Sequence, residues 1–233
     1  MASPNISFDS IPSSIRKPGK YFEFNTKLAV RTLPVNDQKV LLIGPMLATG
    51  LQAPLTPVDI FSDEDAAVYF GRGSVAHLMA RSAIKSYGYV RLSMIGVLDS
   101  GAGVVATGTV TLTGPATSSG QVSLLINNTQ VDIAVTNGDT ANALATKLRT
   151  AISALDDLPV TASVAGAVIT LTCRHKGSVG NEIAVTSIIT ATGVTAAIVA
   201  MNAGAGDPDI TPALAAVYGA GHNIIACPFS TQT

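Results

Sequence analysis

The sequence predicts a mixed α/β fold, α+β overall, in which a partial parallel-type α/β core domain is interrupted by an inserted β-rich domain with one helix. Between residues 40 and 98, short continuous apolar runs alternate with a helical pattern, which is the order of a parallel α/β sheet. From about residue 104 to 203, Thr, Val and Ile alternate as in antiparallel strands, and the first pattern returns afterwards.

Residues 1–22 are typical of an extended N-terminal arm rather than of a helix or an ordinary strand. Prolines interrupt any helical period, and spaced apolar side chains remain between them. Such an arm needs a surface to lie on, either its own domain or a neighbouring subunit, and the sequence favours neither. A strand pattern follows around residues 21–24. The candidate subunit-contact residues of the arm are Ile6, Phe8, Ile11, Ile15 and Tyr21.

The segment 23–100 predicts the strand, helix, strand unit of a parallel sheet. A continuous apolar run at 40–44 indicates a strand buried on both faces. Ser62 then stands at the N-cap position of a helical segment that reaches about residue 87, with a break at Gly71–Gly73. A second buried strand is expected over 89–98.

The segment 207–233 returns to this pattern and completes the discontinuous core domain. Thr211–Pro212 begins a helix with Pro at its first position, and 223–227 is expected to be one more buried strand. Gly-rich linkers stand at both junctions of the insertion. The core would hold about three core strands, against a mean of about 5–6, so we expect the chain to be a fragment of something longer.

The segment 101–206 predicts the inserted β-rich domain. Its helix is expected from Ala141 to about Ala154, packed on a sheet through an apolar stripe. An apolar stretch at 183–205 is broken by polar residues and rich in β-branched ones, so it predicts a buried strand pair rather than a membrane span. Two hairpins are expected, 122–126 with 131–135 and 160–164 with 168–172.

The composition is apolar and poor in charge. Hydrophobic residues make up 47% of the 233 residues and charged residues 12%, about half the usual share. A surface that partner proteins cover would explain the low share of charged residues, and so would a globular protein rich in Ala. The net charge of −1 and the lack of a basic stripe predict no direct nucleic-acid binding. Cys173 and Cys227 predict two buried free thiols of a reducing cytoplasm.

We predict no catalytic, cofactor-binding or metal-binding residue. Gly71–Ser74 lacks the third Gly of a dinucleotide motif and the Lys of a P-loop, and Gly177–Asn181 reads as a polar loop. The remaining candidates have local structural explanations: they are the three histidines without ligand spacing, His77, His175 and His222, and the acidic clusters at 63–65 and 156–157.

Several segments together resemble the tail sheath proteins of Mu-like contractile-tail phages, in their N-terminal part. The opening from Ile6 to Tyr21, the strand at 39–44 preceded by Arg31–Pro34, the turn at 70–74 and the strand at 224–228 carry the resemblance. The resemblance covers the arm and both core segments. The insertion is also similar, though less specifically.

The resemblance implies a virion structural subunit, not an enzyme. Such a subunit polymerises with itself as a helical sheath around the tail tube protein and contracts to drive tube and DNA delivery. Baseplate and tail terminator proteins are the further partners that the resemblance implies. The sheath would assemble in the host bacterial cytoplasm without inserting into a membrane, and the inserted domain would face outward. Family members are longer, with a C-terminal part that completes the inner domain.

Two other functions stay open. The segment 101–206 could be an adhesion module of a phage or prophage particle. A small α/β enzyme would need polar groups at the carboxyl ends of its parallel strands. Those ends, at 44–46, 98–100 and 227–229, offer almost no acid or base.

Overall fold

The computed structural model describes residues 14, 16–20, 22, 38–88 and 91–229. The chain divides into two compact units, 1–37 and 38–233, and the second contains all the described helices and strands. The strand expected at 21–24 lies outside the described residues except for Phe22. The arm residues Ile6, Phe8, Ile11, Ile15 and Tyr21 all lie outside them.

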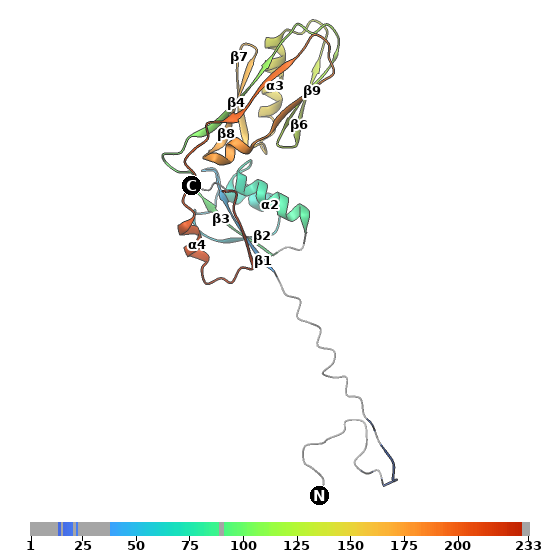
Figure 1. The fold of residues 1–233 in the computed structure, drawn as a ribbon, viewed down its shortest axis with the longest axis vertical. Coiled ribbons are helices and arrows are strands. Elements are labelled where there is room, and N and C mark those ends of the chain that lie inside the picture. The colour runs from blue at the N-terminus through green and yellow to red at the C-terminus, as the bar shows by residue number, and fades with distance from the viewer. Residues whose placement is uncertain (1–13, 15, 21, 23–37, 89–90, 230–233) are drawn as a thin grey trace. The chain divides into compact units, whose positions relative to one another are not determined.

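A four-stranded sheet with the order β11-β1-β3-β2 forms the α/β part (Figure 1). β1 (Lys39–Pro45) pairs in parallel with β3 (Arg91–Val97) and with β11 (Ile224–Ala226), which confirms the predicted parallel strands. An antiparallel edge strand, β2 (Val58–Ile60), was not predicted. This strand has only three residues and follows Pro57 directly. A sequence pattern of that length cannot distinguish a strand from a loop.

Helices cover both faces of this sheet, as the continuous apolar pattern of β1 requires. Leu42 packs with α1 (Asp63–Phe70) and α2 (Val75–Ser86), whereas Leu41 and Ile43 pack with α4 (Thr211–Val217). The Ser62 side chain accepts a hydrogen bond from the Asp65 amide at 3.1 Å, so the predicted N-cap is confirmed. Pro212 is the second residue of α4 rather than the first.

The strand at 223–227 is shorter and more exposed than expected. β11 is an edge of the sheet, and Ile224 and Ile225 are 45% and 52% exposed. Cys173 is buried, but Cys227 beside this edge is exposed, so the prediction of two buried thiols holds only for the first. The exposure of β11 and that of Cys227 have one cause, because among the described strands β11 has a neighbour on one side only.

Two antiparallel sheets and one helix form the β-rich segment. The first has the order β10-β4-β8-β7 and the second β6-β5-β9. The apolar stretch at 183–205, expected to be a buried strand pair, contains β9 and β10, but these strands lie in different sheets and only Met201 of their residues is buried. Both predicted hairpins are confirmed. The elements are β4 (Val105–Leu112), β5 (Gly120–Ile126), β6 (Thr129–Val135), α3 (Ala141–Ser153), β7 (Val160–Ala165), β8 (Val168–Lys176), a 3₁₀ turn (Ser178–Glu182), β9 (Val185–Ile189) and β10 (Ala196–Asn202).

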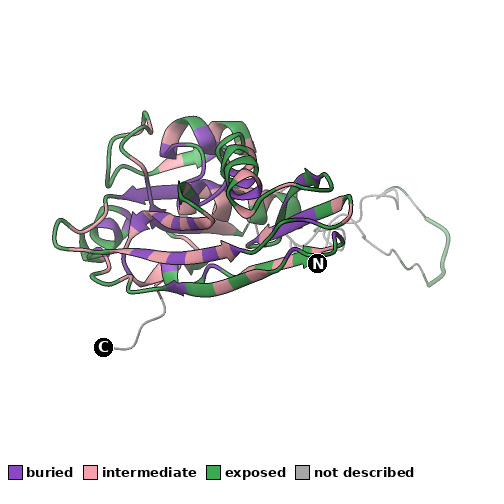
Figure 2. Cartoon of the chain, turned by 90° about the horizontal axis from the view of Figure 1, so that it is seen from above, coloured by how far each residue is buried: buried purple, intermediate pink, exposed green. Residues whose placement is uncertain are grey.

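Alternating burial along the strands explains why this segment has its own core (Figure 2). The helix α3 contributes Leu144, Leu148 and Ile152, each at most 1% exposed, to a cluster that includes residues of both sheets. The predicted fold class is therefore confirmed, while the exact domain boundaries stay a prediction. Among the described residues, no helix is long and apolar enough to cross a membrane.

Candidate functional site

The junction between the α1–α2 helices and the β-rich segment gathers charged side chains. Asp157, in the turn before β7, accepts a hydrogen bond from Arg81 of α2 at 2.7 Å and another from Arg72 at 3.1 Å. Arg72 also bonds Glu64 at 2.6 Å, and Arg81 bonds Asp63 at 3.0 Å. One carboxylate of the β-rich segment thus holds two arginines of the α/β part.

The loop between the two helices is shaped to fit this junction. Gly71 and Gly73 have positive φ values of 87° and 77°, and Ser74 caps α2 by accepting the His77 amide at 3.0 Å. A Cβ atom on Gly73 would lie 2.5 Å from the carbonyl oxygen of Asp156. The break predicted at Gly71–Ser74 is therefore a tight turn that lies against the β-rich segment.

Two buried histidines flank the same loop. His77 is 0% exposed, and its Nδ1 accepts a hydrogen bond from the Gly73 amide at 3.1 Å. His175 is 1% exposed, and its Nε2 accepts from the Val75 amide at 3.3 Å while its Nδ1 lies 2.9 Å from an Asp99 oxygen. Burial, followed by the nearby charge of Arg81, lowers the pKa of His77 below its ordinary value.

The polar loop predicted at Gly177–Asn181 binds a carboxylate of the chain itself. Ser178 donates its amide and its hydroxyl to the two oxygens of Asp207, at 2.6 and 2.7 Å. A Cβ atom on Gly177 would collide with the same carboxylate. The loop therefore closes the base of the β-rich segment, as its polar-loop interpretation predicted.

The carboxyl ends of the parallel strands, where open α/β sheets bind their ligands, hold apolar side chains. Met46 and Val97 are 4% and 2% exposed, and the nearby Asp99 is engaged with His175 and with the amide of Lys176. Within the part of the chain that the structure describes, no group of three or more His, Cys, Asp or Glu residues could hold a metal ion.

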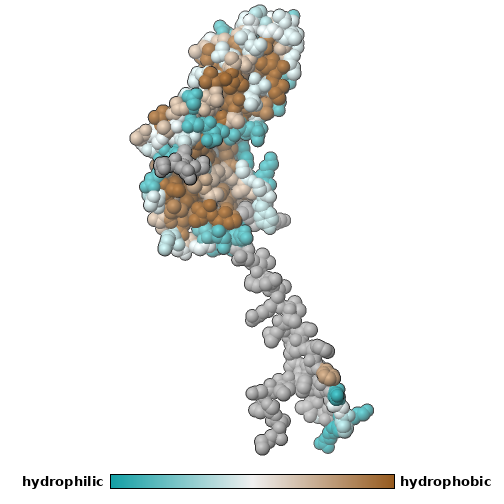
Figure 3. All heavy atoms as spheres, viewed as in Figure 1, coloured by the Kyte–Doolittle hydropathy of each residue, from teal (hydrophilic) through white to brown (hydrophobic). Residues whose placement is uncertain are grey.

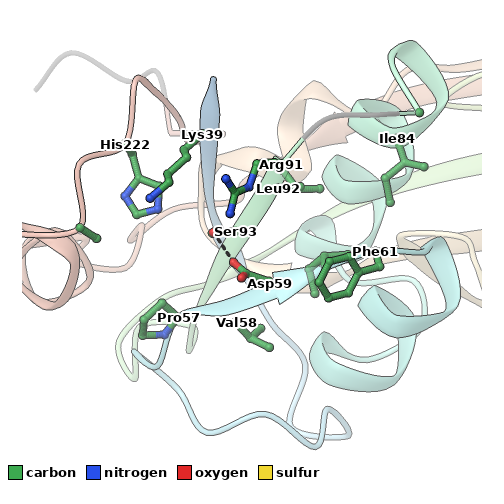
Figure 4. Close-up of a pocket in the computed structure, with 13 residues that line it drawn as sticks. Lys39, Pro57, Val58, Asp59, Phe61, Ile84, Arg91, Leu92, Ser93 and His222 are labelled. Atoms are coloured by element: carbon green, nitrogen blue, oxygen red, sulfur yellow. Dashed lines mark hydrogen bonds between the residues drawn. The ribbon is translucent and has the colours of Figure 1, made fainter. Parts of the chain in front are cut away.

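A cavity of about 620 Å³ lies instead at the amino ends of these strands (Figure 4). Lys39 and Arg91 line it from the starts of β1 and β3, and His222 lines it from the loop before β11. The Asp59 carboxylate on its wall accepts a hydrogen bond from Ser93 at 2.5 Å. Basic groups around a partly apolar hollow can bind an acidic side chain.

A hydrophobic surface accompanies the sheet edge. In Figure 3, apolar side chains gather on the face that carries α4. Leu214 of α4 is 38% exposed, and the two isoleucines of β11 are about half exposed. An exposed parallel edge strand with apolar side chains can pair with a further strand.

The residues of the junction were not predicted as a site. The acids at 63–65 and 156–157 and both buried histidines each have a sufficient local explanation, at a helix start, in a turn or in a core. The contacts that cross to the β-rich segment join residues distant in sequence, as with Val75 and His175, which are separated by 100 residues. Only the glycines of the loop carry a local signal, and that signal predicted a turn.

No protein-family model matches the chain. The chain is 38% identical over 231 residues to the Mu-like prophage FluMu tail sheath protein of Haemophilus influenzae, which covers 97% of this chain and 47% of that protein. It thus spans about half the length of this curated relative, and the predicted resemblance is confirmed. A solved sheath tail protein of Listeria innocua matches 84% of this chain and 41% of its own, with 14% identity and a TM-score of 0.30.

Proposed function

From the chain's relationship to a Mu-like tail sheath protein, we propose that it is a structural, non-enzymatic subunit of a phage contractile tail sheath. The observation that carries this proposal is the similarity along nearly the whole chain, which includes both core segments and the β-rich segment. The apolar carboxyl ends of the parallel strands support a structural role, because an α/β enzyme would place its reacting groups there.

Self-assembly is the central activity that we propose. The subunit would polymerise helically around the tail tube protein and would contract through rigid-body movement of subunits, which drives the tube and DNA into the host. Tail terminator and baseplate proteins would contact the two ends of this sheath. The protein would act in the virion tail after assembly in the host cytoplasm.

The N-terminal arm is the proposed link between subunits. Its residues Ile6, Phe8, Ile11, Ile15 and Tyr21 would bind a neighbouring subunit. The edge strand β11 supports this proposal. Among the described residues it has a strand neighbour on one side only, and its half-exposed Ile224 and Ile225 suit the addition of an extended segment. The chain would then consist of an arm at 1–22, an assembling core at 23–100 and 207–233, and an outer domain at 101–206.

The adhesion alternative has less support. Residues 101–206 contain no Phe, Tyr or Trp. Binding sites for small ligands are usually lined by hydrophobic and aromatic side chains, and this segment has no aromatic ones. The segment would therefore cover the outside of the sheath rather than bind host glycans.

Electron microscopy of the protein at its natural length, produced alone, tests this function. We expect long hollow tubes. The triple variant I6S/I11S/I15S should give dispersed subunits, and the matched polar variant S7A/S10A should still form tubes. A monodisperse monomer at high concentration and in all salt conditions would count against the sheath role, and tubes from the triple variant would count against the arm.

A further inference from the structure

A small apolar socket lies beside the carboxyl ends of the parallel strands, where an α/β enzyme would bind its substrate. Its volume is about 240 Å³, enough for one large side chain. Rigid prolines and leucines form most of its wall, and its rim carries one carboxylate. These residues are Pro54, Leu55, Leu98, Pro208, Pro212 and the acidic Asp209.

The wall of the socket includes a strained residue. Leu55 has a φ of 62°, and among the described residues no other large apolar side chain has a positive φ. The Leu55 amide donates a hydrogen bond to the Gly96 carbonyl at 2.9 Å, which holds the residue against the end of β3. Backbone strain of this kind is concentrated at functional sites. Leu55 and Leu98 are 39% and 51% exposed, so the socket presents apolar walls to the solvent.

Asp209 places a negative charge beside these apolar walls. Its Oδ1 accepts a hydrogen bond from the Thr211 amide at 2.8 Å, and hydrogen bonds from the side chain and the backbone of Thr211 lower the pKa of this exposed carboxyl. The nearby Asp207 is already bound to Ser178. The socket therefore suits an apolar side chain that has a cation next to it.

The N-terminal arm contains one contact candidate in that setting. Ile15 is followed directly by Arg16 and Lys17, and the nearest acids, Asp9 and Glu23, are six and eight residues away. The other four candidates each lie within three residues of one of these acids, which Asp209 would repel. These four are Ile6, Phe8, Ile11 and Tyr21.

The distribution of charge along the chain favours the same pairing. Residues 1–37 hold five of the 14 Lys and Arg residues and three of the 15 acids, so residues 38–233 hold nine basic and twelve acidic residues. The arm is therefore positive, whereas the rest of the chain is negative. Opposite charges on the arm of one copy and the body of another would speed their encounter.

We propose that Ile15 of one copy enters this socket on a second copy, where Arg16 pairs with Asp209. This inference rests on the proposed sheath role, because it gives one residue of the arm its binding site on the neighbouring subunit. The edge of β11 is left to other residues of the arm. The carboxyl ends of the strands then serve for docking between subunits rather than for chemistry.

Disulfide trapping between two whole chains tests the socket. One chain carries I15C and a size tag, and the other carries L98C, both in a C227S background that leaves only the buried Cys173. After mixing under mild oxidation, we expect a covalent heterodimer on a non-reducing gel. Because the two cysteines are on different chains, this bond reports docking between copies. The matched control, I11C with L98C, should react about tenfold more slowly, the loss expected when a central contact residue is misplaced.

Exchanged charges test the pairing of Arg16 with Asp209. R16E in the first chain should slow the trapping by about two- to fivefold, the range expected for an exposed ion pair, and D209K in the second chain should do the same. When R16E and D209K are combined, the opposite charges face each other again, so the native rate should return. A merely structural effect of either substitution would persist in the combination.

Several outcomes would overturn the socket. These are no heterodimer from I15C and L98C, equal trapping of I11C and I15C, or an exchanged pair that reacts as slowly as its single variants. Tubes from the native protein together with no trapping would overturn the socket alone and leave the sheath role. A trapped heterodimer from a protein that forms no tubes at its natural length would instead count against the sheath role alone.

Discussion

Arg81 and Asp157, which are 76 residues apart in sequence, are joined by a hydrogen bond of 2.7 Å between Nη2 and Oδ2. Asp157 also accepts a bond from Arg72. Burial acts to raise the pKa of Asp157, but the hydrogen bonds from Arg81 and Arg72 outweigh it, and the pKa is lowered. The carboxylate is therefore charged at neutral pH and connects the β-rich segment to two arginines.

Removing this charge should weaken the junction by a small amount. The side chains of Asp157, Arg72 and Arg81 are 33–41% exposed, so water screens the pair and D157N should cost about 1 kcal/mol of unfolding free energy. Urea unfolding followed by circular dichroism measures this cost. The matched control is D156N, because the neighbouring acid is exposed and makes no ion pair with any described residue. Equal costs for both variants would contradict the proposed role of Asp157.

The close fit of the α1–α2 loop can be tested with alanine at two glycines. Gly73 and Gly138 both have positive φ, at 77° and 91°, so each substitution costs about 1 kcal/mol in backbone strain. Only at Gly73 would the new Cβ also meet backbone oxygens, at 2.5 and 2.8 Å. We therefore expect G73A to lower the melting temperature clearly more than G138A. A similar loss for both would show that the loop is not packed against the turn before β7.

The helix α3 should be essential for the core of the β-rich segment. Leu148 is 0% exposed, and L148A should cost about 2–5 kcal/mol because it leaves a cavity between the helix and the sheets. The next residue, Arg149, is exposed, and R149A should change stability by less than about 0.5 kcal/mol. Denaturant unfolding compares the two, and a tolerated L148A would argue against this packing.

The stability of the chain should decrease on mild acidification. Burial and Arg81 lower the pKa of His77, so the unfolded chain takes up a proton more readily than the folded one. Its contribution is complete above about pH 6.5 and is lost as the pH falls towards the folded-state pKa. Unfolding midpoints measured between pH 7.5 and pH 5 should fall in the native chain and fall less in H77N. A midpoint that rises on acidification would contradict this sign.

Local patterns predicted much of the fold. The hairpin of β5 and β6 follows from alternation on both sides of a polar turn, where Asn127 and Asn128 adopt positive φ values of 49° and 68°. The strand β1 followed from a continuous apolar run that helices cover on both faces. These elements depend on residues close together in sequence, which is why the sequence alone predicts them.

Local patterns do not predict contacts between residues that are distant in sequence. Nothing near Asp99 indicates that it orients His175, and nothing near Arg81 indicates that its partner is Asp157. The exposure of β11 was also missed, because an apolar run has the same appearance at the edge of a sheet as at its centre. The junction depends on tertiary pairing, for which a single sequence holds no local signal.

Immunogold electron microscopy of phage particles that carry this protein tests the sheath role most directly. With antibodies against residues 101–206, we expect gold particles at regular intervals along the whole tail shaft, because every sheath subunit would present this segment outward. Labelling confined to fibres or to the tail tip, or a shaft that stays unlabelled while the protein is present in the particle, would contradict the account.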